Sequence, residues 1–240
     1  MKVAFIQMNS GSDMATFLAQ ARSLIEKAVR EEKPDWVSLP KVYDFMGGSL
    51  RDKRVAAEKL PDGPAWTMMR DLAKKRGVYI NGGSILEKVD GEEIARYRKI
   101  HMSDIVTHDG QEYCESKAYG QVDAVANYDS EGVTVGCTIC YDLRVPEIFQ
   151  ALITLPSAFT LQTGKDDWEV LIRARAIETE TYISAAGQTG THEQGNEVRT
   201  TYGHSLVADP WGHVVARLDL TKVKKVRTMI PVAQYKVKLT

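Results

Sequence analysis

The chain has 240 residues and a formal net charge of −1 at pH 7, with 43% hydrophobic and 26% charged residues. This length is enough for one large α/β domain with a substantial core, so we expect a single domain over residues 1–240. The balanced charge gives no broad positive surface, which argues against nucleic acid as a partner. We expect the basic run at 222–227 to be a solvated segment.

The chain carries no signal of a membrane or secreted protein. No apolar run approaches the roughly 20 residues that cross a bilayer, so we expect no membrane partner. The N-terminal segment 2–8 is typical of a core strand and differs from a signal peptide. Three cysteines, an odd number, form no disulfide framework and fit a reducing compartment. We therefore expect a cytoplasmic protein.

The first half of the chain alternates between strand and helix patterns. Apolar residues recur every three or four positions over 14–29, which predicts an amphipathic helix. Further predicted elements are a short buried strand at 36–40, a helix at 64–75 with Trp66, Met69, Leu72 and Ala73 facing inward, and a strand at 78–80. This alternation favours a layered α/β fold.

The second half of the chain repeats this alternation. Strands are predicted at 133–139, 153–156 and 182–186, and helices at 146–152 and 166–180. Residues 209–212 have Pro at the second position and Gly at the fourth, as in a type I turn. The turn predicts a hairpin between 204–209 and 212–218.

The segment 133–147 is a β-branched run that reaches Cys140 and then turns into a helix. Pro146 at a first helical position would set the helix, whose free N–H groups and dipole favour a thiolate at Cys140. Cys137 and Cys140 also form a C-x-x-C pair, which could indicate a redox pair or half of a zinc site. No second C-x-x-C occurs, and strand alternation separates the two thiols, so a nucleophile is favoured over both. Cys114 is interpreted as incidental.

Residues 136–144 resemble the cysteine elbow of the nitrilase superfamily, the carbon-nitrogen hydrolases that cut amides and nitriles through a thioester. Other segments resemble the same family in the same order, and together they extend over most of the chain: 97–101, 156–160, 168–169, 173–178 and 202–212. The resemblance implies a four-layer α-β-β-α sandwich that forms a homodimer or higher oligomer. It also implies a small-molecule amide substrate, with no metal and no organic cofactor needed.

The resemblance assigns roles to individual residues. Cys140 would be the nucleophile, Lys99 would contact the thiolate and the oxyanion, and the backbone N–H of Tyr141 would be a second oxyanion donor. Glu115 would position the substrate and Lys99. Without the resemblance, a lone strand lysine or a surface glutamate would be taken as solvated. Phe159 and Thr160 would lie on the substrate side, where they suggest a short carboxamide, as for an omega-amidase.

Lys41 is the main departure from the family pattern. It stands directly after a Leu-Pro strand end, where the family has a glutamate that acts as general base. A charged ammonium could stabilise the thiolate but could not accept a proton, although burial beside another cation can make a lysine basic. Two hypotheses follow, an amidase slowed by Lys41 and a catalytically inactive relative that binds a ligand or partner. Ser103, Gln121 and Asp167 are further departures near the expected substrate site.

Two connections look shortened relative to the family. One lies between Glu93 and Ile94, and the other lies between Ala151 and Ile153, where a predicted helix and strand nearly meet. Connections of this kind usually have 2 to 6 residues. We therefore expect family segments to be missing at both places.

Overall fold

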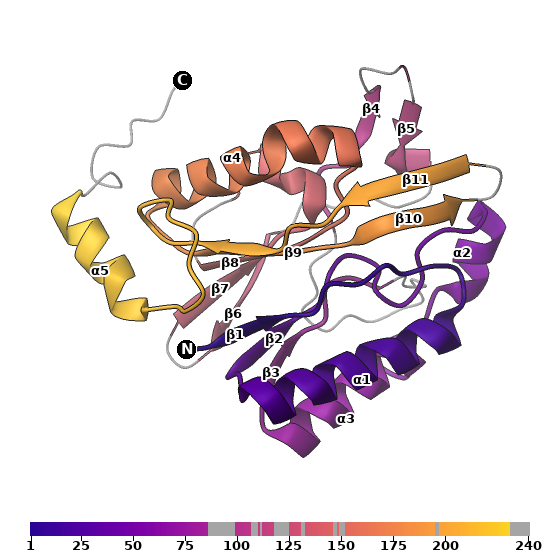
Figure 1. Ribbon diagram of the computed structural model, residues 1–240, viewed down its shortest axis with the longest axis horizontal. Coiled ribbons are helices and arrows are strands. Elements are labelled where there is room, and N and C mark those ends of the chain that lie inside the picture. Colours follow the sequence, from indigo (N-terminus) through magenta and orange to yellow (C-terminus); the bar gives the residue numbers. More distant parts are fainter. Residues whose placement is uncertain are drawn as a thin grey trace.

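The computed structural model describes residues 1–85, 99–106, 110, 112–117, 125–130, 133–145, 148, 152–194 and 197–230. Two sheets lie face to face, with helices covering the outer face of each (Figure 1). The layers run from helices α1 and α3, through a three-stranded and a five-stranded sheet, to helix α4. The predicted α-β-β-α sandwich is confirmed.

The first sheet has the order β1-β2-β3 and is parallel. Its strands are β1 (Val3–Phe5), β2 (Trp36–Ser38) and β3 (Tyr79–Asn81), and the connecting helices are α1 (Met14–Glu32), α2 (Leu50–Ala56) and α3 (Pro64–Arg76). Strand β2 ends at Ser38, two residues earlier than the predicted Pro40. Because the strands are parallel, the chain leaves β1, β2 and β3 at the same edge of the sheet.

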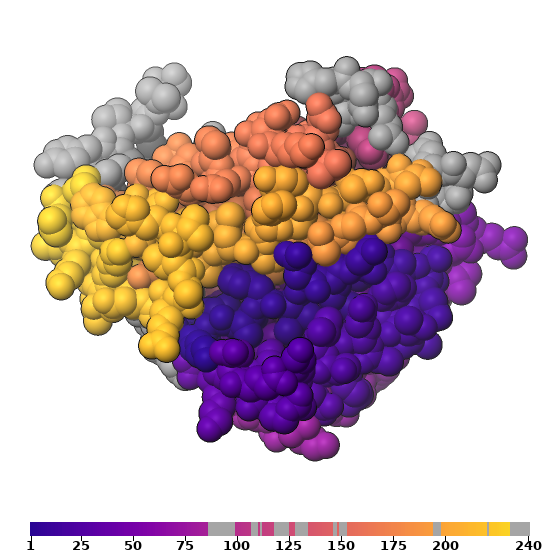
Figure 2. All heavy atoms as spheres, viewed as in Figure 1, coloured from indigo at the N-terminus to yellow at the C-terminus, as the bar shows by residue number. Residues whose placement is uncertain are grey.

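The second sheet has the order β12-β9-β8-β7-β6. Its strands are β6 (Ala126–Ser130), β7 (Val133–Cys137), β8 (Leu152–Ser157), β9 (Ile183–Gly187) and β12 (Leu206–Ala208), and α4 (Leu161–Thr179) joins β8 to β9. The three central strands are parallel, whereas the two outer strands are antiparallel to their neighbours. The N-terminal part and the part from β9 onward each form a separate band of the visible surface (Figure 2).

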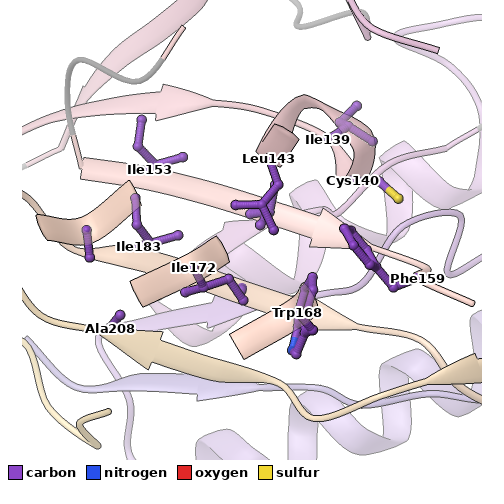
Figure 3. Close-up of a cluster of buried hydrophobic side chains, with 12 residues drawn as sticks. Ile139, Cys140, Leu143, Ile153, Phe159, Trp168, Ile172, Ile183 and Ala208 are labelled. Carbon is purple, nitrogen blue, oxygen red and sulfur yellow. The ribbon is translucent and has the colours of Figure 1, made fainter. Parts of the chain in front are cut away.

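Three of the buried clusters fill the three spaces between the layers. One packs α1 and α3 on the first sheet, with Ile25 and Val37 fully buried. The second lies between the sheets and contains Trp36 of β2 and Val135 of β7. The third joins α4 to the second sheet, where Ile153 is among the labelled aliphatic side chains (Figure 3). Trp36 and Val37 face opposite clusters because neighbouring strand residues alternate.

Several elements of the structure were not predicted. The hairpin β10 (Thr189–Gln194) and β11 (Glu197–Tyr202), the short pair β4 (Asp104–Val106) and β5 (Glu112–Cys114), and the helix α5 (Leu220–Met229) were not predicted. Helix α5 contains the basic run expected to be a solvated segment, and its Val226 is buried. The predicted turn at 209–212 is confirmed by a hydrogen bond from Gly212 N to Asp209 O at 2.7 Å. The predicted hairpin is reduced to an isolated bridge between Ala208 and Val214.

One prediction about the helices was wrong in detail, and a second is tested only at its last residue. Trp66 is 38% exposed, because the buried face of α3 is formed by Ala65, Met68, Met69 and Leu72, and Trp66 points away from it. The predicted helix at 146–152 lies mostly outside the described residues, and its last residue, Leu152, begins strand β8. No helix within the described residues is long and apolar enough to cross a membrane.

Candidate active site

Cys140 lies at a sharp turn after strand β7. A 3-10 turn, Cys140–Arg144, begins at this residue and precedes the segment of the predicted helix at 146–152. The Cys140 backbone has a φ of 54°, in the left-handed region that residues with a side chain rarely adopt. Such strain persists where surrounding contacts enforce it, often at reactive sites. Cys140 is 5% exposed and lies with Phe159 at one end of the α4 cluster (Figure 3).

Asp142 holds this turn in place. Its fully buried carboxylate accepts a hydrogen bond from Ile139 N at 2.9 Å, and therefore fixes the residue before Cys140. The same carboxylate accepts from His101 N at 3.0 Å and lies 2.9 Å from His101 Nδ1. His101 stands two residues after Lys99, so Asp142 connects the cysteine turn to the segment that carries the lysine.

Lys41 lies just beyond the end of β2, on a constrained backbone. Gln188 donates from Nε2 to the carbonyl oxygen of Lys41 at 3.0 Å. The next residue, Val42, has a φ of 44°, which is strained for a β-branched side chain, and its N–H donates to Ser84 Oγ at 3.0 Å. A Cβ on Gly83 would lie 2.0 Å from the carbonyl oxygen of Pro40, so a glycine is needed beside this turn.

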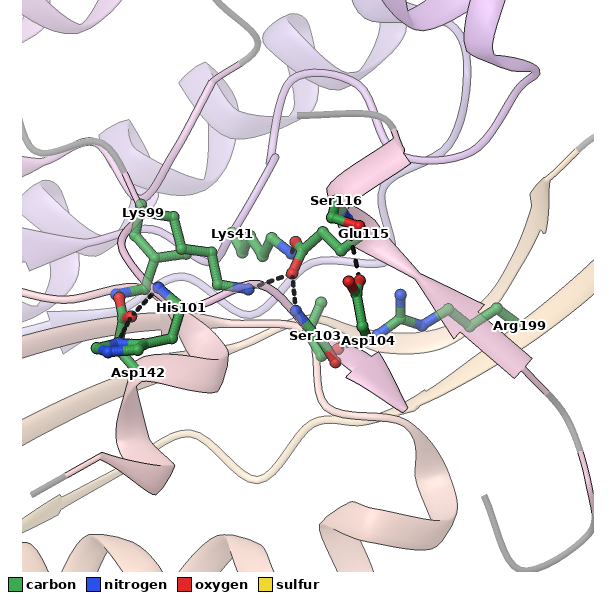
Figure 4. Close-up of polar contacts among 11 residues, drawn as sticks. Lys41, Lys99, His101, Ser103, Asp104, Glu115, Ser116, Asp142 and Arg199 are labelled. Atoms are coloured by element: carbon green, nitrogen blue, oxygen red, sulfur yellow. Dashed lines mark hydrogen bonds and ion pairs between the residues drawn. The ribbon is translucent and has the colours of Figure 1, made fainter. Parts of the chain in front are cut away.

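Glu115 brings the two lysines together. Lys41 Nζ forms an ion pair with Glu115 Oε1, and Lys99 Nζ forms one with Glu115 Oε2. Ser103 N donates to the same carboxylate at 2.8 Å. The side chains of Lys41, Lys99 and Glu115 are 12%, 8% and 9% exposed, and Figure 4 shows both lysines converging on the glutamate. The cluster is nearly closed to water.

The charges of this cluster act strongly on each other. Burial raises the pKa of the Glu115 carboxyl, but the ammonium groups of Lys41 and Lys99 outweigh it and hold that pKa well below its usual range. Burial lowers the pKa of Lys99 and the Lys41 ammonium lowers it further, against the opposite effects of Cys140 and Glu115. Burial also lowers the pKa of Lys53 on α2, with Lys41 and Arg199 adding to the effect. The site therefore has a surplus of positive charge.

Aromatic rings line the neighbourhood of Cys140. The Lys99 Nζ atom lies 6.0 Å from the centroid of the Tyr141 ring. The Arg144 guanidinium lies 5.8 Å from the Tyr141 ring and 5.6 Å from the Phe159 ring. Phe159 in turn packs against Trp168, with ring centroids 5.0 Å apart. These rings and cations surround the cysteine turn on its α4 side.

Thr160 has a structural role that the sequence prediction did not include. Its hydroxyl accepts a hydrogen bond from Thr163 N at 3.3 Å and lies 2.9 Å from Thr163 Oγ1. Thr160 is therefore the N-cap of α4, which begins at Leu161 and not at the predicted residue 166. The assignment of Thr160 and Phe159 to substrate binding stays a prediction.

The structure brings together most of the predicted catalytic residues. Lys41, Lys99 and Glu115 are in direct contact, and Cys140 interacts electrostatically with Lys99. Sequence reasoning missed the supporting residues Asp142 and Gln188. Their positions could have indicated these roles, because Asp142 lies within the cysteine elbow and Gln188 directly follows a strand end. Within the described parts of the chain, no group of three His, Cys, Asp or Glu could hold a metal ion.

The arrangement provides the parts of acyl transfer through a thiol. A buried cysteine stands on a strained turn, and a cation that can stabilise negative charge interacts with it. Lys41 pairs with Glu115 beside Lys99, but as an ammonium it lacks the free electron pair that a general base needs.

Comparison with known proteins assigns this chain to a family. The carbon-nitrogen hydrolase family matches residues 2–230. A deaminated glutathione amidase of Synechocystis sp. is 33% identical over 270 residues, covering 98% of this chain and 97% of the relative. The omega-amidase NIT2 of Mus musculus is 30% identical over 266 residues, covering 98% of this chain and 94% of the relative.

A fusion protein shows the same likeness over part of its length. The nitrilase and fragile histidine triad fusion protein NitFhit of Caenorhabditis elegans is 33% identical over 269 residues, covering 98% of this chain but 60% of the relative. Its crystal structure matches this fold with a TM-score of 0.81 at 31% identity, covering 98% of this chain and 64% of that chain. The chain thus spans about three fifths of the fusion protein.

These matches define the class as enzymes that hydrolyse carbon–nitrogen bonds. The chain belongs to the carbon-nitrogen hydrolase family and to the amidase branch of the nitrilase superfamily. The alignment with the Synechocystis amidase extends over 270 positions, more than the 240 residues of this chain, so that relative contains residues which this chain lacks. Of the two shortened connections, the one between Glu93 and Ile94 lies outside the described residues, as does Ala151 at the other.

Proposed function

We propose that this protein hydrolyses small carboxamides through a thioester on Cys140, at a rate limited by Lys41. The observation that carries the proposal is that Lys99 and Lys41 both pair with Glu115, while Lys99 also interacts electrostatically with Cys140. The names of the relatives, omega-amidase and deaminated glutathione amidase, support a small amide as the substrate class.

The first half of the reaction forms the thioester. The Cys140 thiolate attacks the amide carbon, and the electron pair of the C=O bond moves to the oxygen. Lys99 and the backbone N–H of Tyr141 are the proposed donors to this oxyanion. When the C=O bond forms again, the C–N bond breaks, and the leaving amine takes one proton. In the second half, water attacks the thioester, and the acid and the thiol are released.

Lys41 acts on the proton transfers of both halves. A general base typically contributes 10²–10⁴-fold to rate, so we expect turnover to be lower by about that factor than with a glutamate at residue 41. The Lys41 ammonium is 12% exposed and paired with Glu115, which favours its charged form. Attack by the thiolate needs no base once the thiol is ionised, and the leaving amine needs a proton, which the Lys41 ammonium can donate. Attack by water on the thioester needs a base, which a charged Lys41 cannot provide. The acyl group is therefore expected to form on Cys140 and to be hydrolysed slowly.

The deciding experiment follows both steps on one substrate. The protein is incubated with the amides of short carboxylic acids, and the intact mass and the released ammonia are measured together. An acyl adduct on Cys140 with slow ammonia release supports an impaired amidase. Lys41→Glu is expected to raise turnover by about 10²–10⁴-fold. Lys41→Gln is the matched control, because it removes the cation without supplying a base. Failure of Lys41→Glu to raise turnover would overturn the assignment of Lys41 as the cause.

The second candidate function is a catalytically inactive relative that binds a ligand or a partner. The observation that favours it is the ion pair between Lys41 and Glu115, which occupies two positions of the catalytic set. If calorimetry detects binding of an amide, but no adduct forms on Cys140 and no ammonia is released, the inactive binding protein is favoured over the impaired amidase.

We also propose that the protein forms a homodimer. The outer face of α4 supports this, because Val170 and Ile177 are 67% and 52% exposed and stand seven positions apart on one side of the helix. Trp211, 40% exposed, is a further large apolar residue on the surface. Light scattering of the protein and of Val170→Asp tests this proposal, since a charge on that face should weaken the dimer. A monomeric parent protein would refute it.

A further inference from the structure

Two lysines share one buried carboxylate at this site. Lys41 and Lys99 reach different oxygens of Glu115, so their Nζ atoms are held close together. The side chain of Lys99 is 8% exposed, the least of the three. Removal of an ammonium group from water is costly, and a second cation nearby adds to this cost.

A further cation lies near Lys41. Lys53 stands on α2, and its pKa is lowered by burial and then by Lys41 and Arg199. Loss of a proton from a fraction of Lys99, the most deeply buried lysine, lowers this cost, while the charged fraction is the form that would donate to the oxyanion. The lowered pKa of Lys99 agrees with this expectation. A neutral lysine amine is a nucleophile, and lysines that form Schiff bases are prepared by burial or by a neighbouring cation.

We propose that Lys99 is a second covalent site, at which its neutral amine forms an imine with small aldehydes. The proposal goes beyond amide hydrolysis and does not depend on it, since it requires only the cluster of Lys99, Lys41 and Glu115. The departure at residue 41 creates the site, because a glutamate there would support the charged form of Lys99.

The step balances without an oxidant or a metal. The lone pair of Lys99 Nζ attacks the aldehyde carbon, and a C–N bond forms as the C=O electron pair moves to oxygen. The Lys41 ammonium donates a proton to this oxygen and recovers one from the Lys99 nitrogen. The carbinolamine then loses its oxygen as water, and the imine remains. The Tyr141 ring, whose centroid lies 6.0 Å from Nζ, would stabilise the protonated imine.

The pH dependence is set by the groups in contact with Lys99. Lys41 favours its neutral form, whereas Cys140 and Glu115 favour its charged form. Because burial and Lys41 prevail, Lys99 is expected to react at a lower pH than exposed lysines such as Lys27 on α1 and Lys74 on α3. The pH at which each lysine reaches half of its maximal labelling is therefore the direct measure.

The test is reductive trapping on the intact protein. The protein is treated with propanal and cyanoborohydride across a pH series, and the propylated lysines are quantified by peptide mapping. The proposal is supported if Lys99 is labelled at a lower pH and to a greater extent than Lys27 and Lys74. The proposal is overturned if Lys99 is labelled no more than the exposed lysines, or only at the same or a higher pH.

Variants separate this inference from the amidase proposal. Lys41→Met is expected to lower the labelling of Lys99 at neutral pH by about tenfold for each unit by which its pKa recovers. Lys74→Met is the matched control and is expected to leave it unchanged. Cys140→Ser abolishes thioester formation, yet labelling of Lys99 is expected to persist. Unchanged labelling in a folded Lys41→Met variant would overturn the proposal, and the pH series of the parent protein decides if that variant does not fold.

Discussion

The side chain of Gln188 donates from Nε2 to the main-chain carbonyl oxygen of Lys41 at 3.0 Å. The same nitrogen donates to Ser10 Oγ at 2.8 Å, and Gln188 Oε1 accepts from Ser10 N at 3.1 Å. Gln188 follows β9 in one sheet, whereas Ser10 and Lys41 follow β1 and β2 in the other. This one amide therefore connects the strand ends of the two sheets at the position of residue 41.

Replacement of Gln188 is expected to loosen the position of Lys41. Gln188→Leu keeps a similar volume but leaves the buried N–H of Ser10 without its acceptor, at a cost of about 1–3 kcal/mol. Urea unfolding measures this change, and the alkylation rate of Cys140 reports on the site. The matched control is Gln20→Leu on the exposed face of α1, which should change stability by less than about 0.5 kcal/mol. Equal effects of the two substitutions would contradict the role of Gln188.

Asp142→Asn is expected to disturb both the cysteine turn and the lysine segment. The buried carboxylate accepts from Ile139 N and His101 N, and an amide nitrogen at either oxygen would place two donors face to face. We expect a loss of about 1–3 kcal/mol together with slower alkylation of Cys140. Asp71→Asn on α3, where the side chain is 58% exposed, is the control. A loss of stability with no change in thiol reactivity would mean that Asp142 does not position Cys140.

The sequence was sufficient to predict the layered fold because the apolar periodicity of α1 and the strand patterns are local. The cysteine elbow was equally recognisable, since its residues are contiguous. Asp142 and Gln188 were missed because their partners are remote in sequence: Gln188 lies 147 positions from Lys41, and Asp142 lies 41 positions from His101. Hydrogen bonds over such separations leave no periodic pattern in the sequence.

Glu115→Gln is expected to reduce the free energy of unfolding most at pH values above the ordinary carboxyl pKa. Lys41 and Lys99 hold the pKa of Glu115 well below its usual value, so the unfolded state binds more protons in the acid range. This contribution to stability is present above the unfolded pKa and is lost as pH falls toward the folded pKa. Removing one partner of a buried ion pair costs about 3–5 kcal/mol, which is the loss expected at pH 7.

Unfolding by urea at several pH values measures this difference. The difference in unfolding free energy between the parent protein and Glu115→Gln should be constant from pH 7 down to about the ordinary carboxyl pKa near 4.3. Below that pH this difference should become smaller. Glu31→Gln, at the exposed end of α1, should show no such gap. A gap that stays constant to low pH would mean that the carboxylate charge of Glu115 is not the source of the stabilisation.

Thr160→Ala separates the helix cap from the predicted role in substrate binding. The Thr160 hydroxyl caps α4, so its removal should cost about 0.5–2 kcal/mol, and Thr160→Ser should restore most of this loss because serine caps equally well. If Thr160 acts only as a cap, the concentration dependence of Cys140 acylation by a short amide should be the same in the folded variants and in the parent protein. A weakened apparent affinity in Thr160→Ala that Thr160→Ser restores, measured well below the unfolding midpoint, would assign the hydroxyl to the substrate as well. Measuring the unfolding free energy and the acylation rate on the same preparations distinguishes these outcomes, because a loss of cap stability leaves the folded site intact.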